Sequence, residues 1–270
     1  MLIIGLGEAG CNVAKHFKQH EQYHVECLDE GSGIKKQKTA EQYDSIDYRP
    51  RKKAIKSASE GLLIVCGSGK VAGASLRVLE GLKHVKMTIV YLVPDLEYSS
   101  KEEQLRHRVH FNVLQEYTRS GMVSDMILLD NKILIDIVGH GTIYDYYSKV
   151  NHYIYSALHT LNYCNNVKAE FGNVHVPKEI SCISTIGYGL LEKNEEKMFF
   201  KLDNITETGY IININEEELA NDISILPNVK AMAKDNKSLE RETSFAIWST
   251  EETESYYYTK HYTHFIQEIS

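Results

Sequence analysis

Short, mostly apolar runs alternate with stretches of helical spacing over the first half of the chain. Such runs are typical of strands that a parallel sheet buries on both faces. They predict strands at residues 2–4, 24–28, 62–66, 87–93 and 126–129. The spacing between them predicts helices at about 13–20, 76–82 and 99–117, the last with Leu105, Val109 and Leu114 facing inward. The alternation predicts a doubly wound, Rossmann-like parallel sheet with helices on both faces.

A long amphipathic helix follows in the middle of the chain. Its apolar residues fall at i, i+4, i+7, i+8 and i+11, which places them on one helical face: Val150, Ile154, Ala157, Leu158 and Leu161. We expect this helix to run from about residue 149 to residue 163.

The pattern changes in the last third, where strands cluster with short links and few helices. Strands are expected at residues 180–186, 198–200, 210–214, 244–249 and 256–262. A helix is expected between residues 216 and 236, broken near Pro227. This clustering is typical of an α+β domain. We therefore predict a doubly wound domain at residues 1–148, a central connecting helix at 149–169 and a smaller α+β domain at 170–270.

Composition narrows the classes of function. The 270 residues carry a formal net charge of −7, which argues against direct nucleic-acid binding. No apolar run approaches the ~20 residues of a membrane span, and the N-terminus lacks the features of a signal peptide. The five scattered cysteines form no CxxC pair, so we expect reduced thiols. These features predict a cytoplasmic protein without a membrane span.

The first predicted strand ends in a glycine-rich loop, Gly5–Asn12, that opens a helix. It reads GLGEAGCN and matches the pattern G-x-G-x-x-G. Asp29 lies about twenty residues further on, at the end of the next strand, as in dinucleotide-binding folds. Glu8 brings a negative charge that opposes phosphate binding. A tight turn without a ligand and an NAD(P)-binding turn both remain open.

A second glycine-rich loop, Gly67–Ser75, reads GSGKVAGAS between another strand and helix. It is not a Walker A loop, because no glycine lies five residues before Gly69, and Val71 stands where Ser or Thr would bind magnesium. Two such loops at the ends of parallel strands would face one crevice. That arrangement suits a nucleotide with several phosphates.

Together the two loops resemble those of the tubulin/FtsZ superfamily. The first is similar to that family's opening G-x-G-G-G-G-x-N, with Asn12 in the position of the asparagine. The second lies where the family carries G-G-G-T-G-T/S-G. Its glycines match at Gly67, Gly69 and Gly73, and the sequence departs at Ser68, Lys70, Val71 and Ala72.

Later segments resemble further landmarks of this superfamily in the same order. Glu97 resembles its acidic ribose contact, Asn131 its Asn/Asp pair, and Asn151 the asparagine that reads guanine. The stretch Tyr147–Leu161 looks closest to the TubZ-like proteins of plasmids and phages. The resemblance thus implies the following nucleotide-binding residues: Gly7, Glu8, Ala9, Gly10, Cys11, Asn12, Gly67, Ser68, Gly69, Lys70, Val71, Ala72, Gly73, Glu97, Asn131 and Asn151.

The segment after the central helix resembles the superfamily's catalytic loop, N-x-D-x-x-D in FtsZ-like members. Here it reads KAEFGNV over residues 168–174. Glu170 keeps one carboxylate and Asn173 replaces the other, so the resemblance implies these two as catalytic residues. Asn173 can orient a water molecule but cannot act as a base. A solvated loop without a catalytic role is the alternative.

The resemblance implies a GTP-binding cytomotive filament protein. It would bind GTP or GDP with Mg²⁺, polymerise head-to-tail with itself, and hydrolyse GTP when the neighbouring subunit supplies its catalytic loop. The implied role is the positioning or segregation of phage or plasmid DNA through a DNA-binding adaptor, inside a bacterial host or phage-infected cell.

Two alternatives stay open. One is a tubulin-like scaffold that has lost GTP hydrolysis or binding, which the departures at Ser68, Lys70, Val71, Ala72 and Asn173 suggest. Among them, β-branched Val71 disfavours the positive φ that glycine permits. The other is an NAD(P)-binding Rossmann protein.

Overall fold

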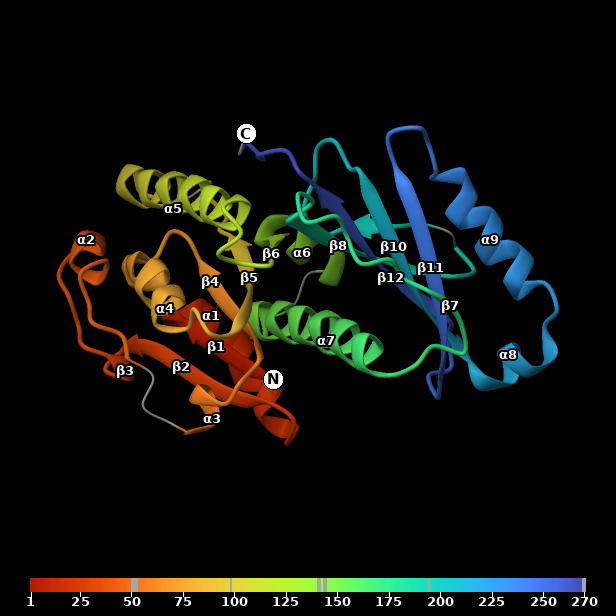
Figure 1. Cartoon of the computed structure of the whole chain (residues 1–270), viewed down its shortest axis with the longest axis horizontal. Helices are drawn as coiled ribbons and strands as arrows, with labels where there is room; N and C mark the ends of the chain where they lie inside the picture. The colour runs from red at the N-terminus through yellow and green to blue at the C-terminus, as the bar shows by residue number, and fades with distance from the viewer. Residues whose placement is uncertain (50–52, 98, 140–141, 143–144, 194, 269–270) are drawn as a thin grey trace. The chain divides into compact units, whose positions relative to one another are not determined.

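The computed structural model describes residues 1–49, 53–97, 99–139, 142, 145–193 and 195–268 (Figure 1). The chain forms two compact units, Met1–Ser156 and Ala157–Gln267. The boundary between them falls within the long helix α7 (Tyr146–Asn166). Among the helices that the structure describes, none combines the length and apolarity that a membrane span requires.

The first unit contains a sheet in which every described pair of strands is parallel. Its order is β3-β2-β1-β4-β5-β6. The strands are β1 (Leu2–Leu6), β2 (His24–Glu30), β3 (Gly33–Ile34), β4 (Glu60–Cys66), β5 (Lys86–Val93) and β6 (Asp125–Asp130). The chain starts at β1 and builds outward in both directions, so the order reverses between β1 and β4. This confirms the predicted doubly wound sheet.

Helices connect these parallel strands. They are α1 (Gly7–His16), η1 (Phe17–Gln19), α2 (Ala40–Tyr43), α3 (Lys53–Lys56), η2 (Lys70–Ala74), α4 (Ser75–Gly81), α5 (Lys101–Arg119) and α6 (Asn131–Val138). Local sequence explains where two of them begin. Ser100 and Glu103 form a capping box at the start of α5, and Asp130 accepts hydrogen bonds from the first amides of α6.

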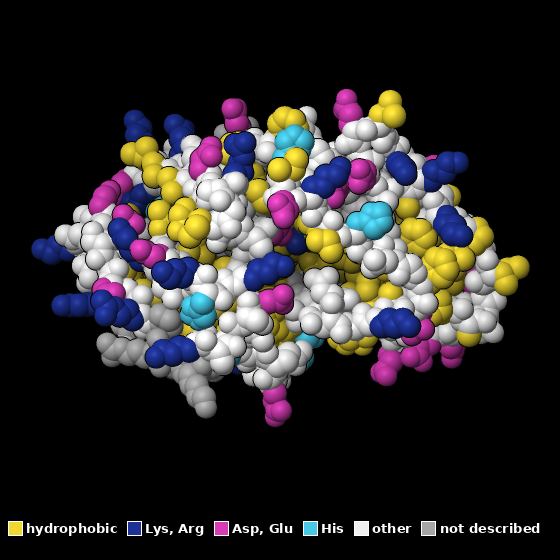
Figure 2. Space-filling model, viewed as in Figure 1, with side chains coloured by type: hydrophobic (Ala, Val, Ile, Leu, Met, Phe, Trp, Pro, Cys, Tyr) yellow, Lys and Arg dark blue, Asp and Glu magenta, His cyan; other side chains and the backbone are white. Residues whose placement is uncertain are grey.

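Helix α5 is oriented differently from the expectation. Leu114 is buried as predicted, but Leu105 and Val109 are 60% and 50% exposed, so their predicted inward orientation is wrong. The inner face instead combines the apolar Phe111 and Leu114 with polar residues, including His107, which is 1% exposed. Figure 2 shows hydrophobic side chains at the surface over α5, beside Lys, Arg, Asp and Glu side chains.

The second unit contains a mixed sheet of order β8-β12-β10-β11-β7, with β9 beside β8. Only the β10–β11 pair is parallel among the pairs described in this unit. The strands are β7 (Phe171–Asn173), β8 (Ile183–Leu190), β9 (Lys197–Met198), β10 (Glu207–Asn215), β11 (Glu242–Thr250) and β12 (Tyr256–Thr263). The expected clustering of strands in the last third is confirmed.

The expected helix between β10 and β11 is present in two pieces, α8 (Glu216–Asn221) and α9 (Ile225–Asp235). The break precedes Pro227, which lies in the first turn of α9, where a helix tolerates the missing N–H. Val229 of α9 belongs to the same buried cluster as Ile212 and Ile214 of β10.

A buried hydrogen-bond network crosses the sheet of the second unit. Nε2 of His261 lies 2.5 Å from the carboxylate of Glu196, and Nδ1 lies 2.9 Å from Oγ1 of Thr208. Arg241 donates to the same Thr208 oxygen at 3.0 Å. Burial alone would raise the pKa of Glu196, but hydrogen bonds from His261 and Thr259 outweigh it and lower that pKa.

Replacing Glu196 tests this network. Because the folded-state pKa lies below its ordinary value of 4.5, the stabilising contribution is present at neutral pH and is lost as the pH falls through the folded-state pKa. Glu196→Ala should lower the free energy of unfolding by about 1–3 kcal/mol at pH 7. The difference from wild type should shrink at pH 4 in urea titrations. Glu195→Ala, at an exposed neighbouring position, is the control. If Glu196→Ala lowered the free energy of unfolding equally at pH 7 and pH 4, the ionised Glu196 carboxylate would not be the source of the stabilisation.

Candidate functional site

A cavity of about 620 Å³ opens in the first unit at the carboxyl ends of the strands. It lies where the strand order reverses between β1 and β4, the position at which doubly wound sheets bind their ligands. Its lining residues are Leu6, Gly7, Glu8, Ala9, Asn12, Asp29, Glu30, Cys66, Ser68, Gly69, Lys70, Val71, Ala72, Leu92, Asn131, Tyr147, Val150 and Asn151. Its volume falls within the range of small-molecule pockets, about 300–1,000 Å³.

The first glycine-rich loop supplies one wall of this cavity. Gly7 begins α1 with φ +73°, a conformation that L side chains rarely adopt. Leu6 precedes it and offers no side-chain cap to the amides of the first helical turn. These amides lack intrahelical partners, and the helix dipole adds positive potential there. The wall formed by Gly7, Ala9 and Asn12 is therefore suited to an anion.

The second glycine-rich loop supplies the adjacent wall. Gly69 stands before η2, which continues into α4, and no side chain caps this start either. In the described residues of this loop, no positive φ occurs. Val71 is therefore accommodated in helical backbone, and the expected conflict with a β-branched side chain does not arise.

Two glycines of this loop have different physical roles. A Cβ atom on Gly67 would lie 1.7 Å from Oη of Tyr91, so packing requires glycine there. A Cβ atom on Gly69 would meet nothing nearer than the Cys66 carbonyl oxygen at 3.9 Å. The fold does not require glycine at this second position, and its bare backbone leaves room for a ligand against the wall.

Charges of both signs line the cavity. Glu8, Asp29 and Glu30 are acidic, and Lys70 is basic. The Glu30 carboxylate accepts hydrogen bonds from Lys36 at 2.8 Å and from Tyr43, and these contacts lower its pKa.

A polyphosphate would need cations here besides Lys70. The described residues contain no group of three or more metal-ligating side chains. Mg²⁺ commonly binds through one or two carboxylates together with phosphate oxygens, and the carboxylates beside this cavity fit that mode.

The remaining wall carries amide side chains and an aromatic ring. Asn131 follows β6, and Asn151 lies on α7, one turn after Tyr147. An amide offers both a donor and an acceptor, and an exposed ring can stack on a planar base. Tyr147 was absent from the predicted site, although its position four residues before Asn151 places both on one helical face. The amide groups and the ring of this wall are therefore suited to the recognition of a nucleobase.

The structure does not bring every predicted residue to the cavity. Gly10, Cys11, Gly67 and Gly73 are buried and are not among its lining residues. Glu97, the predicted ribose contact, is exposed near Lys132, 3.7 Å from its Nζ, and is also absent from the lining. Asp29, singled out for the dinucleotide alternative, does line it.

The predicted catalytic residues lie in the second unit. The Glu170 amide donates to the Ile247 carbonyl at 2.8 Å, and Asn173 pairs with Phe245 at the β7 edge strand. Both side chains are exposed. The sequence did not predict β7, because a three-residue strand containing glycine and asparagine has little strand propensity.

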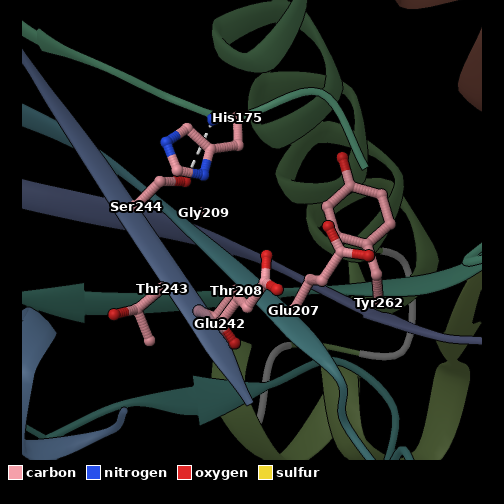
Figure 3. A pocket seen from close by; sticks show the side chains of 8 residues that line it. All are labelled: His175, Glu207, Thr208, Gly209, Glu242, Thr243, Ser244 and Tyr262. Carbon is pink, nitrogen blue, oxygen red and sulfur yellow. Dashed lines mark hydrogen bonds between the residues drawn. The ribbon is translucent and has the colours of Figure 1, made fainter. Parts of the chain in front are cut away.

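A second cavity in that unit is much smaller (Figure 3). Its volume is about 10 Å³, room for about one water molecule. The figure shows the His175 amide donating to Oγ of Ser244 at 3.0 Å. The buried Glu207 accepts from Ser181 at 2.8 Å, so this carboxylate has a partner within the protein. This cavity is too small for a metabolite.

The chain has the tubulin/FtsZ fold. It superimposes on TubZ from Bacillus thuringiensis serovar israelensis, in a GTPγS-form protofilament, with a TM-score of 0.70 and 14% identity over 96% of this chain and 86% of that one. An FtsZ dimer from M. jannaschii gives a TM-score of 0.70 and 12% identity over 97% and 87% of the two chains. CetZ from Methanosaeta thermophila gives 0.62 and 12% over 97% and 86%. No family model matches the sequence, and no curated protein matches it.

The contrast between Gly67 and Gly69 is testable by substitution. Gly67→Ala should lower the free energy of unfolding by about 1–3 kcal/mol or more, because its Cβ atom collides with Tyr91. Gly69→Ala should leave it unchanged or raise it by up to about 1 kcal/mol. Denaturant titration measures both. Equal destabilisation by the two would contradict the assigned roles.

Proposed function

We propose that this chain is a GTP-binding, tubulin-like cytomotive protein that assembles head-to-tail into filaments. The proposal rests on one cavity that is lined by the uncapped N-termini of α1 and η2. Its remaining wall carries Asn131, Tyr147 and Asn151, whose side chains can recognise a nucleobase. The fold supports it, because the similar TubZ structures include protofilaments in GTPγS and GDP forms.

The walls suggest how the nucleotide lies. Its phosphates would face the amides that begin α1 and η2, with Lys70 adding positive charge. The base would lie between the ring of Tyr147 and the amide of Asn151, and the carboxylate of Asp29 suits the ribose hydroxyls. Bound Mg²⁺ would neutralise phosphate charge.

Hydrolysis would depend on a second copy of the chain. The Glu170 carboxylate of one subunit would accept a proton from the water that attacks the γ-phosphate held by the next, and Asn173 would orient that water. The segment is suited to this role because its backbone is fixed and its side chains are exposed. Trp248 donates to the Val167 carbonyl at 3.0 Å, just before Glu170.

The cellular role follows from the same proposal. A cytoplasmic filament of this kind would move or segregate plasmid or phage DNA through a DNA-binding adaptor, since the net charge of −7 disfavours direct DNA binding. The second candidate function is NAD(P) binding, which the position of Asp29 in the cavity lining favours.

Nucleotide titration separates the two candidates. GTP should bind and displace a fluorescent GTP analogue, and NADH should not. Gly69→Ala should weaken GTP binding about tenfold or more, because its methyl group occupies space beside the phosphates. Tight NADH binding without GTP binding would overturn the proposal in favour of the dinucleotide alternative.

Assembly and hydrolysis are tested by light scattering and phosphate release with GTP and magnesium. Wild-type protein should show a GTP-dependent rise in scattering followed by phosphate release. Glu170→Ala should still bind GTP and assemble, with phosphate release reduced about 100-fold, because the proton acceptor is lost. Glu179→Ala, an exposed carboxylate change in the same unit, is the control. Assembly without any hydrolysis by wild type would instead support the scaffold alternative.

A further inference from the structure

Helix α5 holds two consecutive carbonyl groups of the second glycine-rich loop. Nε of Arg106 donates to the Ser68 oxygen at 2.9 Å, and Nδ1 of His110 lies 2.9 Å from the Gly67 oxygen. The Arg106 side chain is 14% exposed, and it also contacts the Glu102 carboxylate at 2.5 Å. A single helix therefore fixes the orientation of two adjacent peptide groups beside the cavity.

Peptide geometry determines which way the opposite ends of these groups point. In a planar trans peptide the C=O of one residue and the N–H of the next point in opposite directions. With the Gly67 and Ser68 carbonyls turned toward α5, the amides of Ser68 and Gly69 point away from that helix. Ser68 and Gly69 both line the cavity.

The thiol of Cys66 supports this orientation. Cys66 also lines the cavity, and its sulfur lies beside both the amide and the hydroxyl of Ser68. Sulfur is a weak acceptor, so a phosphate oxygen would compete effectively for this amide.

Side chains are closely packed beneath the second glycine-rich loop. Oη of Tyr91 lies 2.8 Å from Nδ1 of His107, and both residues lie directly under Gly67. Burial lowers the pKa of His110, so at neutral pH it acts as an uncharged imidazole with its hydrogen on Nδ1. His107 lies on the inner face of α5 together with Phe111 and Leu114, and Leu105 and Val109 face solvent.

We propose that Arg106 and His110 are positioning residues that aim the Ser68 and Gly69 amides at the phosphates of the bound nucleotide. This rests on the proposed function, since the ligand is a nucleoside triphosphate. The two side chains act on the phosphates through the loop backbone and do not touch the base wall formed by Tyr147 and Asn151. They therefore strengthen binding of GTP without strengthening binding of guanosine.

The test compares affinities for GTP and guanosine, measured by calorimetry on the full chain. Arg106→Ala and His110→Ala should each weaken GTP binding about tenfold and leave guanosine binding within about twofold, since each removes a hydrogen bond that orients an amide. Arg108→Ala, at an exposed position of the same helix, should change neither affinity.

Two conservative substitutions of His110, to Asn and to Gln, test the proposal even if an alanine variant fails to fold. His110→Asn places an amide nitrogen where Nδ1 lies and should retain most GTP affinity, and His110→Gln moves that nitrogen one bond further and should lose it. Equal behaviour of the two would overturn the inference. Equal losses for GTP and guanosine would show a merely structural role and would also overturn it.

The result for wild type separates this inference from the proposed function. Wild-type binding of GTP with no change in the Arg106 and His110 variants would overturn the inference alone. Failure of the wild-type protein to bind GTP would overturn the proposed function and this inference together.

Discussion

The candidate site depends on main-chain amides at the ends of two neighbouring parallel strands. β1 and β4 end side by side, and each leads into a helix that no side chain caps. Buried or half-buried amides without partners are costly, so these helix starts favour a ligand that accepts hydrogen bonds from them. Lys70 and the acidic residues Glu8, Asp29 and Glu30 line the same cavity and set its charge.

The glycines of this site have different structural roles. Gly67 is glycine because Tyr91 leaves no room for a side chain, and Gly7 because its φ is positive. Gly69 has neither constraint and stands at the cavity wall. Counting matches to a glycine motif therefore overstates how many residues approach a ligand. It also overstates the harm of substitutions such as Val71, which occupies ordinary helical backbone.

The sequence was sufficient for the sheet of the first unit, because strands buried on both faces leave continuous apolar runs such as residues 62–66. It was insufficient for α5, because a search for apolar spacing does not reveal that the buried face includes His107, Gln115 and Thr118 beside Phe111 and Leu114. It also missed β7, whose pairing with β11 depends on a residue distant in sequence, Phe245. In the site, loop residues were predictable from local motifs, and Tyr147 could have been inferred from its spacing of four residues to the predicted Asn151.

The use of backbone groups to form the cavity walls affects how far the sequence of these loops can vary. Every residue except proline carries the same N–H group. Residues such as Ser68 and Val71 can therefore stand in the loop in place of other residue types without loss of a backbone hydrogen-bond donor. The backbone path decides which groups face the cavity, so chains with this fold can differ widely in sequence and still present the same N–H groups. The chains that superimpose at a TM-score of 0.70 with identities of 12–14% show how few side chains this backbone path requires.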